Sequence, residues 1–387
     1  MLRRDSTPRP GRVSPSAMRD LIGELRDGIW ALSPSRFPYR RFFAALALGG
    51  AGGWSFARLQ LPLPWMLGPM TVCTIAALFR APIAAPAVVR PPMTMVIGVL
   101  LGAGFSPAIL GQLPSWIAPL LGLLAFILVC GLACVSYFRV VARYDPVTAY
   151  FAGMPGGLVE MVILGEERGG NARTIALIHS ARILLIVMTL PFIVQWLLGV
   201  SLGARPAFGR SLLDTPWPSD LWLVATAIVG AILGDWLRLP AKYLLGPMLV
   251  SAAVHIVGLS DFQPPQEIVI AAQLVLGTTI GCRFLGTPPR EILSVLLVSL
   301  GSTAILVAIT LAFGYLIARV STFGAIPLIL AYSPGGLAEM SLIALALHIE
   351  VAFVAAHHVI RVFLVMVGAG LVFGFTPAAR RKRGAPP

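Results

Sequence analysis

The sequence predicts an all-α polytopic membrane protein made of two tandem homologous repeats. The chain has 387 residues, of which 57% are hydrophobic and only 12% are charged, whereas a soluble domain carries about 25% charged residues. Apolar stretches recur along the whole chain and reach the roughly 18 residues that a helix needs to cross a hydrocarbon core. A set of motifs that occurs twice predicts the repeats.

The motifs recur at a nearly constant spacing of 178 or 179 residues. Each copy holds a Leu-Gly-Pro-Met segment, a Pro-Gly-Gly segment followed by a glutamate, and a His/Arg pair further on. In the first copy these are 67–70, 155–161, His179 and Arg182, and in the second 245–248, 334–340, His358 and Arg361. A constant spacing over more than 100 residues indicates a duplication.

The repeats divide the chain into five parts. We expect a basic tail with a short amphipathic helix over 1–41, a first membrane repeat over 42–200, a link over 201–220, a second membrane repeat over 221–376, and a basic tail over 377–387.

Charge predicts the orientation of the chain. The net charge is +13, with nine arginines in residues 1–41 and a second cluster at 380–383. Both clusters flank apolar segments, which is typical of cytoplasmic anchors in a multi-pass protein of the bacterial inner membrane. No segment resembles a helix that reads nucleic acid. We therefore expect the lipid bilayer, not nucleic acid, as partner, with both termini in the cytoplasm.

Positive charges in the loops of the two repeats are out of phase, which indicates that the repeats have opposite orientation. Opposite orientation requires an odd number of crossings in each repeat. Five net crossings result if each Pro-Gly-Gly segment enters and leaves on the same side. We therefore expect about ten transmembrane helices and two broken or re-entrant segments.

The Pro-Gly-Gly segments are predicted helix breaks, because proline lacks the N–H donor and glycine loosens the backbone. Freed backbone groups in a membrane must be buried in protein or face water. Two such breaks at corresponding positions of opposed repeats indicate a transport site near the bilayer midplane. A packing kink is the alternative.

Glu160 and Glu339 follow the two breaks at the same distance. A carboxylate in a membrane span costs about 2.5–3.5 kcal/mol and usually faces a cavity or a partner. One interpretation is a proton- or cation-linked site or a solute contact. The other is a structural ion pair with Arg182 or Arg361.

His179 and Arg182, like His358 and Arg361, are three residues apart and share a helical face. Arginine suits binding of carboxylate or phosphate, and histidine titrates near neutral pH. Structural pairing with the glutamates is again the alternative. The candidate solute- or ion-binding residues are Pro155, Gly156, Gly157, Glu160, His179, Arg182, Pro334, Gly335, Gly336, Glu339, His358 and Arg361.

The Leu-Gly-Pro-Met segments are expected to break or tighten the second helix of each repeat. Their main role would be close helix packing, with a backbone contribution to a central cavity as the alternative. The four cysteines lie in apolar segments, so packing is favoured over metal ligation. No cofactor or metal is predicted.

On these paired motifs the chain resembles the AbrB family of duplicated bacterial membrane proteins, over about 42–376. Members of that family are labelled ammonia monooxygenases or regulators of gene expression, and the name is shared with an unrelated DNA-binding protein. The resemblance implies an integral membrane protein involved in regulating expression. It implies no settled substrate, cofactor or catalytic residue.

Three functions compete. A secondary transporter or exporter of a small solute, with an anion as one option, accounts for the repeats, the breaks and the buried charges. A membrane regulator of expression, acting directly or through solute levels, follows from the family label. A monooxygenase would need a dense cluster of metal ligands, and the sequence has only one adjacent His pair, His357-His358. We expect a transporter and not an enzyme, and the chain could form a homo-oligomer.

Overall fold

The computed structural model describes residues 23, 26–28, 30–199, 210–214, 217–347 and 349–374. Most of the N-terminal basic tail, most of the inter-repeat link and the C-terminal basic cluster lie outside the described residues, as does His348.

Helices connected by short loops make up the described chain, which contains no β-strand. In chain order the α-helices are α2 (Tyr39–Arg58), α3 (Pro64–Leu78), α4 (Arg90–Gly102), α5 (Ile109–Gln112), α6 (Ile117–Val140), α7 (Pro146–Gly153), α8 (Leu158–Glu167), α9 (Ala172–Leu198), α10 (Trp217–Trp236), α11 (Lys242–Val257), α12 (Gln266–Gly281), α13 (Pro289–Ala318), α14 (Ala325–Tyr332), α15 (Leu337–Ala346) and α16 (Val351–Phe373). Short 3₁₀ helices lie at Ala87–Val89, Leu113–Trp116 and Cys282–Phe284.

Six helical stretches in the described residues are long and apolar enough to cross a membrane. The all-helical prediction is confirmed, and the composition is that of a membrane protein. The six stretches are Ile109–Val140, Ala172–Leu198, Trp217–Trp236, Gln266–Phe284, Arg290–Ala318 and Val351–Phe373.

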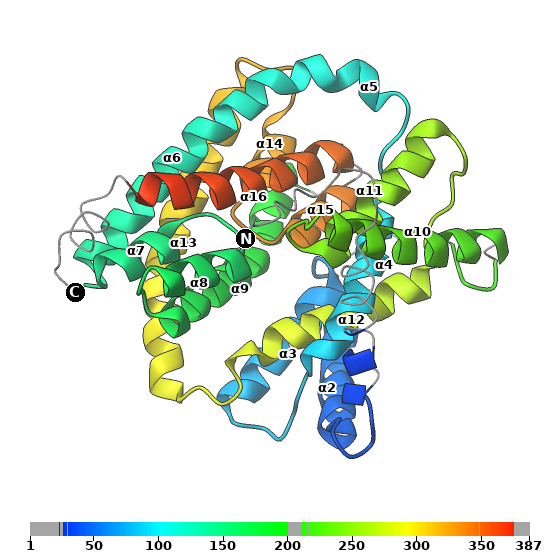
Figure 1. The fold of residues 1–387 in the computed structure, drawn as a ribbon, viewed down its shortest axis with the longest axis horizontal. Coiled ribbons are helices and arrows are strands. Elements are labelled where there is room, and N and C mark those ends of the chain that lie inside the picture. The colour runs from blue at the N-terminus through cyan, green and yellow to red at the C-terminus, as the bar shows by residue number, and fades with distance from the viewer. Residues whose placement is uncertain are drawn as a thin grey trace, which may run out of the picture.

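The helices form two groups, each packed mainly within itself. We call α2, α3, α4, α10, α11 and α12 the scaffold bundle, and α6–α9 with α13–α16 the hairpin bundle. In Figure 1 the scaffold bundle occupies the right and the lower part of the view and the hairpin bundle the upper left. Contacts between the bundles are sparse and run mainly from α4 to α15 and α16 and from α12 to α9.

Glycines bring the helix backbones of the scaffold bundle into contact. Gly68 of α3 lies against the backbone of Gly52 on α2, and Gly246 of α11 lies against Gly230 on α10, so a Cβ atom at any of these positions would collide with backbone atoms. The expected role of the Leu-Gly-Pro-Met segments in close packing is therefore confirmed. The expected break is wrong, because α3 and α11 continue through Pro69 and Pro247.

Further glycine contacts establish that helices from the two halves of the chain run parallel. Gly98 and Gly102 of α4 pack against the carbonyl groups of Leu244 and Met248 on α11. Since residue numbers rise together along both helices, α4 and α11 point in the same direction. The same holds for α3 and α12, where Gly277 and Gly281 pack against the carbonyls of Met66 and Met70.

The helices alternate between two ends of the molecule, which we call the Tyr39 end and the Arg58 end after the first and last residues of α2. Contacts between loops fix the assignment. The N–H of Ala84 donates to the carbonyl of Arg41 (3.2 Å), and Gly104, after α4, lies against Val351 at the start of α16. Helix α16 therefore begins at the Arg58 end.

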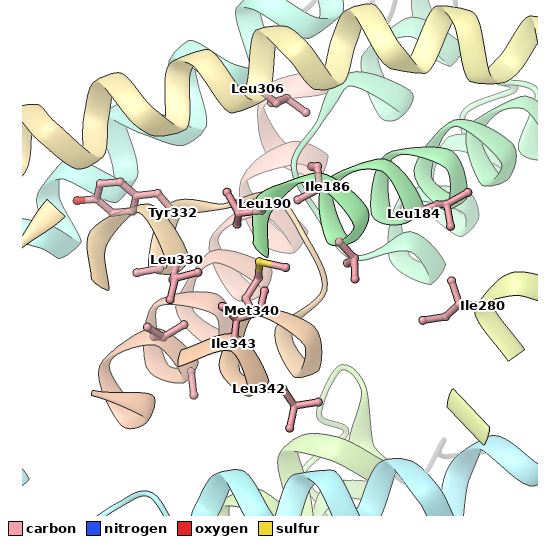
Figure 2. Close-up of a cluster of buried hydrophobic side chains, with 14 of the residues drawn as sticks. Leu184, Ile186, Leu190, Ile280, Leu306, Leu330, Tyr332, Met340, Leu342 and Ile343 are labelled. Atoms are coloured by element: carbon pink, nitrogen blue, oxygen red, sulfur yellow. The ribbon is translucent and has the colours of Figure 1, made fainter. Parts of the chain in front are cut away.

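The core of the hairpin bundle is apolar and surrounds the short helices α14 and α15. Figure 2 shows Leu190 of α9, Leu330 and Tyr332 of α14, and Met340 and Ile343 of α15 meeting there. All five are buried.

Neighbouring glycines of α2 provide a matched test of the scaffold contacts. Gly52→Ala should lower the melting temperature of the detergent-solubilised protein, because its Cβ would collide with the carbonyl of Gly68, at a cost of about 1–3 kcal/mol for overpacking. Gly50→Ala, where a Cβ meets open space, should leave stability unchanged or raise it by up to about 1 kcal/mol. Equal melting temperatures for the two variants would contradict the close contact.

Candidate functional site

The Pro-Gly-Gly segment of the first repeat separates two short helices. Asp145 caps α7 by accepting the N–H groups of Val147 and Thr148 (3.0 and 2.9 Å). Burial acts to raise the pKa of Asp145, but hydrogen bonds from Thr148 and Val147 outweigh it and hold the pKa below its usual value. Helix α7 stops at Gly153, and Met154 is extended (φ −65°, ψ 135°) because the ring of Pro155 disfavours helical geometry before it.

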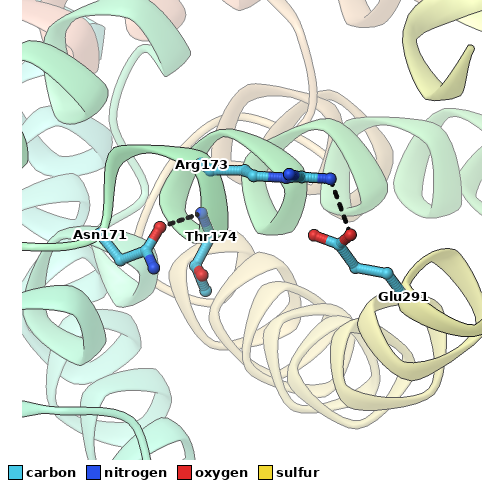
Figure 3. A network of polar contacts seen from close by, with 4 residues as sticks. All are labelled: Asn171, Arg173, Thr174 and Glu291. Atoms are coloured by element: carbon cyan, nitrogen blue, oxygen red, sulfur yellow. Dashed lines mark hydrogen bonds and ion pairs between the residues drawn. The ribbon is translucent and has the colours of Figure 1, made fainter. Parts of the chain in front are cut away.

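Helix α8 returns to the end from which α7 entered. The N–H of Asn171, just before α9, donates to the Thr148 hydroxyl in the first turn of α7 (2.8 Å). The segment therefore forms a hairpin that begins and ends at the same end of the molecule. Asn171 also caps α9 by accepting the N–H of Thr174 (3.0 Å), and Arg173 binds Glu291 of α13 (2.7 Å), as Figure 3 shows.

The second Pro-Gly-Gly segment makes the same kind of hairpin from the opposite end. Helix α14 ends at Tyr332, and α15 begins at Leu337. Phe323, before α14, stacks on Phe353 in the first turn of α16 with ring centroids 4.1 Å apart. The start of α14 and the start of α16 thus lie at one end, and α15 leads back to it.

Arg182 of α9 binds the broken end of α7. Its two terminal nitrogens donate to the carbonyls of Met154 (3.0 Å) and Gly156 (3.4 Å), and one of them also donates to His179 Nδ1 (2.8 Å). Because Nδ1 of His179 accepts, its Nε2–H is left to donate to the carbonyl of Phe151 (2.9 Å). The imidazole is therefore held as one neutral tautomer, and both side chains are buried.

Arg361 of α16 repeats this arrangement at the end of α14. Its guanidinium donates to the carbonyls of Tyr332 (3.3 Å), Ser333 and Gly335 (3.0 Å), and to His358 Nδ1 (3.1 Å). His358 Nε2 lies 2.9 Å from the carbonyl of Leu330. In both hairpins the His/Arg pair therefore binds backbone carbonyls that the break leaves without a helical partner.

The arginines lie deep inside the helices that carry them. Each is ten residues beyond the first residue of its helix, Ala172 or Val351, which is roughly 15 Å along a helix. That depth is about half of a 30 Å hydrocarbon core.

Glu160 and Glu339 cover the other side of each break. Gly157 and Gly336 are the N-cap residues of α8 and α15, and each glutamate is the third residue of its helix. The carboxylate folds back over the glycine and fills the space that a Cβ would need. The positive N-terminal end of the helix dipole stabilises a carboxylate there.

The described chain shows no ion pair between these glutamates and Arg182 or Arg361. The alternative of a structural pair between them is therefore wrong for this structure. Glu339 is 9% exposed and Glu160 is half-buried. Solute or ion binding by the candidate residues stays a prediction.

Arg283 is a charged neighbour of Glu339 that was not among the candidate residues from the sequence. It lies in the 3₁₀ turn after α12, its charge acts on that of Glu339, and its Nη1 is buried without a hydrogen-bond partner. Gly104 stands at the matching position of the first repeat, so the two hairpins differ in charge. The signal in the sequence was an arginine, two residues after the repeated Gly281, that has no counterpart in the first half.

Histidines without a counterpart in the other repeat pack within the fold. His255 lies between the carbonyls of Ser251 (2.7 Å) and Phe262 (2.9 Å), and His357 lies against the ring of Phe353. The four cysteines are buried and free. In the described residues, no group of three or more His, Cys, Asp and Glu could hold a metal ion.

The family model described as "Transition state regulatory protein AbrB" matches residues 65–376. The chain belongs to the AbrB family. It is 26% identical over 346 residues to "Uncharacterized protein YhjN" of Bacillus subtilis (strain 168), covering 83% of this chain and 89% of that protein. It is also 25% identical over 337 residues to "Putative regulator AbrB" of Escherichia coli (strain K12), covering 85% of this chain and 94% of that protein. The AbrB resemblance predicted from the paired motifs is confirmed.

Removing Arg361 tests its binding to the end of α14. Arg361→Met keeps most of the side-chain length but leaves buried carbonyls without donors, at about 1–3 kcal/mol for each unsatisfied group. We expect a lower melting temperature and less protein in the membrane. The exposed Arg290 of α13 provides the control, and Arg290→Met should behave as wild type. Recovery of stability in Arg361→Met/Glu339→Gln would contradict this geometry, because it would mean that the two side chains form an ion pair.

Proposed function

We propose that this AbrB-family chain is a secondary transporter of a small solute, with the solute or coupling-ion site at the tips of the two hairpins. The observation that carries the proposal is the pair of re-entrant hairpins. Each is broken in the interior, and each has an arginine at the carbonyl side of the break and a glutamate at the amide side. Discontinuous helices of this kind are typical of transport sites near the bilayer midplane.

The direction of packed helices supports inverted repeats and, with them, the proposal. Helix α4 is the third helix of its repeat and α11 the second, so in repeats of equal orientation they would be antiparallel. They are parallel, as inversion requires. In this proposal α2, α3, α4, α6 and α9 make five crossings in the first repeat, α10, α11, α12, α13 and α16 make five in the second, and the hairpins are re-entrant.

The distribution of charge supports placing the Tyr39 end in the cytoplasm, at the bacterial inner membrane. In the described residues the basic side chains outside the hairpin site gather at that end, and only Arg58, Arg210 and Arg319 lie at the other. Cytoplasmic loops carry the excess of Lys and Arg. The Tyr39-end residues are Arg36, Arg40, Arg41, Arg80, Arg90, Arg139, Arg143, Arg168, Arg173, Arg238, Lys242 and Arg290, and we place Arg26 with them.

The two-bundle architecture allows one bundle to move relative to the other. Backbone contacts at glycines hold the scaffold bundle together, while its contacts with the hairpin bundle are sparse. Movement of the hairpin bundle against the scaffold would expose the hairpin tips to either side in turn, which is the basis of alternating access.

Regulation of gene expression is the second candidate, since a relative carries the name of a regulator. A transporter can also change expression by altering the level of an internal metabolite. We do not propose oxygen chemistry, which needs a cluster of metal ligands. Metabolite profiling of a deletion strain separates these candidates. Loss of a transporter changes the internal level of its solute before it changes gene expression.

Reporter fusions test the inverted topology. A fusion at residue 210 should report the periplasm, and fusions after residue 143 and at the C-terminus should report the cytoplasm, because the two repeats each cross an odd number of times. Equal signals at residue 210 and at the C-terminus would rule out the inverted arrangement.

Removing both acids tests the transport site. Glu160→Gln/Glu339→Gln keeps side-chain size and most hydrogen bonds but removes both charges, so the protein should accumulate normally and fail to complement a deletion strain. Glu166→Gln, at an exposed position of the same helix α8, is the matched control and should complement fully. Normal abundance with full complementation by the double variant would exclude the acids from function.

A further inference from the structure

An open hollow of about 540 Å³ lies beside the start of α2, and no residue of the two hairpins lines it. Asp27, Trp30, Arg36 and Phe37 line one side, and the loop residues 86–88 line the other. We call it the Trp30 hollow. Its volume falls in the range of roughly 300–1,000 Å³ that is typical of sites for small ligands.

Backbone and ring contacts hold the two sides of the Trp30 hollow together. The N–H of Ala84 donates to the carbonyl of Arg41 (3.2 Å), which ties the loop after α3 to the first turn of α2. The buried ring of Phe37 packs edge-on against Phe42, with centroids 5.2 Å apart. The hollow is therefore formed by packed elements of the fold.

The Trp30 hollow lies at the level where a stretch able to cross a membrane ends. Ile83, in the loop after α3, packs in one apolar cluster with Cys282, which is two residues from the end of Gln266–Phe284. Trp30 and Tyr39 are 60% and 38% exposed, and Trp and Tyr gather where a bilayer meets water. The hollow therefore lies at the membrane surface, within reach of lipid headgroups.

Two opposite charges line the hollow without binding each other. The guanidinium of Arg36 lies over the Trp30 ring, with its carbon 3.4 Å from the ring centroid. This contact positions the cation and uses none of its N–H donors. Among the described residues Arg36 forms no ion pair, and Asp27 pairs only with the exposed Arg26 at 3.7 Å. Such surface pairs contribute little, so both charges can bind a ligand.

We propose that the Trp30 hollow binds the headgroup of phosphatidylethanolamine, with its phosphate on Arg36 and its ammonium on Asp27. This inference goes beyond the proposed transport function and does not depend on it. The headgroup joins a negative and a positive charge by a short chain, which matches a cation and an anion that line one hollow and do not pair directly. Both contacts are charge-assisted hydrogen bonds.

Other phospholipid headgroups match the hollow less well. Phosphatidylglycerol has no cation for Asp27, and its negative charge would lie beside that carboxylate. Phosphatidylcholine has a cation, but methyl groups replace its N–H donors. A basic surface alone would favour the anionic phosphatidylglycerol, because Arg40 and Arg41 are exposed next to the hollow. Preference for phosphatidylethanolamine therefore distinguishes this site from general attraction to a basic surface.

Native mass spectrometry of the purified full-length protein tests this preference. The protein in detergent would be mixed with equal amounts of the dioleoyl forms of the three lipids, and the lipids that stay bound would be counted. We expect wild type to retain phosphatidylethanolamine roughly threefold or more above either of the others, because each of them loses a contact to Asp27. Equal or higher retention of phosphatidylglycerol or phosphatidylcholine would overturn the site.

Variants of the two charges identify the contacts. Asp27→Asn should remove the preference for phosphatidylethanolamine over phosphatidylglycerol, and Arg36→Gln should lower retention of phosphatidylethanolamine. Arg40→Gln is the matched control, because Arg40 is exposed four residues further on and does not line the hollow. It should keep the wild-type preference. Lipid ratios are read on folded protein in one sample, so unchanged ratios in Asp27→Asn and unchanged retention in Arg36→Gln would overturn the site.

A headgroup without acyl chains separates a lipid from a soluble ester. Glycerophosphoethanolamine at the same concentration should not displace the bound lipid, because it lacks chains that bury apolar area. Displacement would mean that the hollow takes a soluble phosphate ester, and would overturn the lipid proposal. Glu160→Gln/Glu339→Gln should retain the lipid as wild type does. Its complementation therefore reports on transport alone, and the two proposals can fail separately.

Discussion

Two guanidinium groups bind the carbonyl ends of two helices that stop in the interior, and the hairpin bundle depends on these contacts. A helix broken among apolar side chains leaves carbonyls that neither lipid nor water can satisfy. Arg182 supplies donors for α7, and Arg361 for α14. The same contacts join each hairpin to the helix that follows it, because the arginine lies halfway along that helix. Loss of either arginine would therefore affect both the break and the packing.

Charge is arranged in the same sense at both breaks. The carbonyl end of the first helix meets an arginine, and the amide end of the second helix meets a glutamate. Each charge offsets the partial charge of a helix end, which lets charged side chains remain inside an apolar protein. The histidines complete the arrangement, since each accepts from its arginine and thereby fixes the orientation of the guanidinium.

The two bundles are held together by different means. In the scaffold bundle, glycines such as Gly68 and Gly246 bring backbones into direct contact, which leaves little freedom for sliding. The hairpin bundle packs through larger side chains such as Tyr332 and Phe126, whose rings stack. This difference makes the scaffold bundle the more rigid of the two, whereas the hairpin bundle contains the two helix breaks. Arg283, whose charge acts on that of Glu339, makes the two hairpins unequal, because Gly104 stands at the matching position of the first half.

The sequence by itself determined the helical class, the places of the breaks and the paired residues around them. These features are local: proline and glycine interrupt a helix wherever they occur, and apolar composition is independent of contacts. The tertiary structure decided the rest. The return of the first hairpin to its starting end is seen in the contact between Asn171 and Thr148, and the carbonyl partners of Arg182 lie 26 to 28 residues away in sequence. The spacing of residues along the sequence could not show whether Arg182 binds a carbonyl, a glutamate or a solute, because its partner depends on how the helices pack in three dimensions.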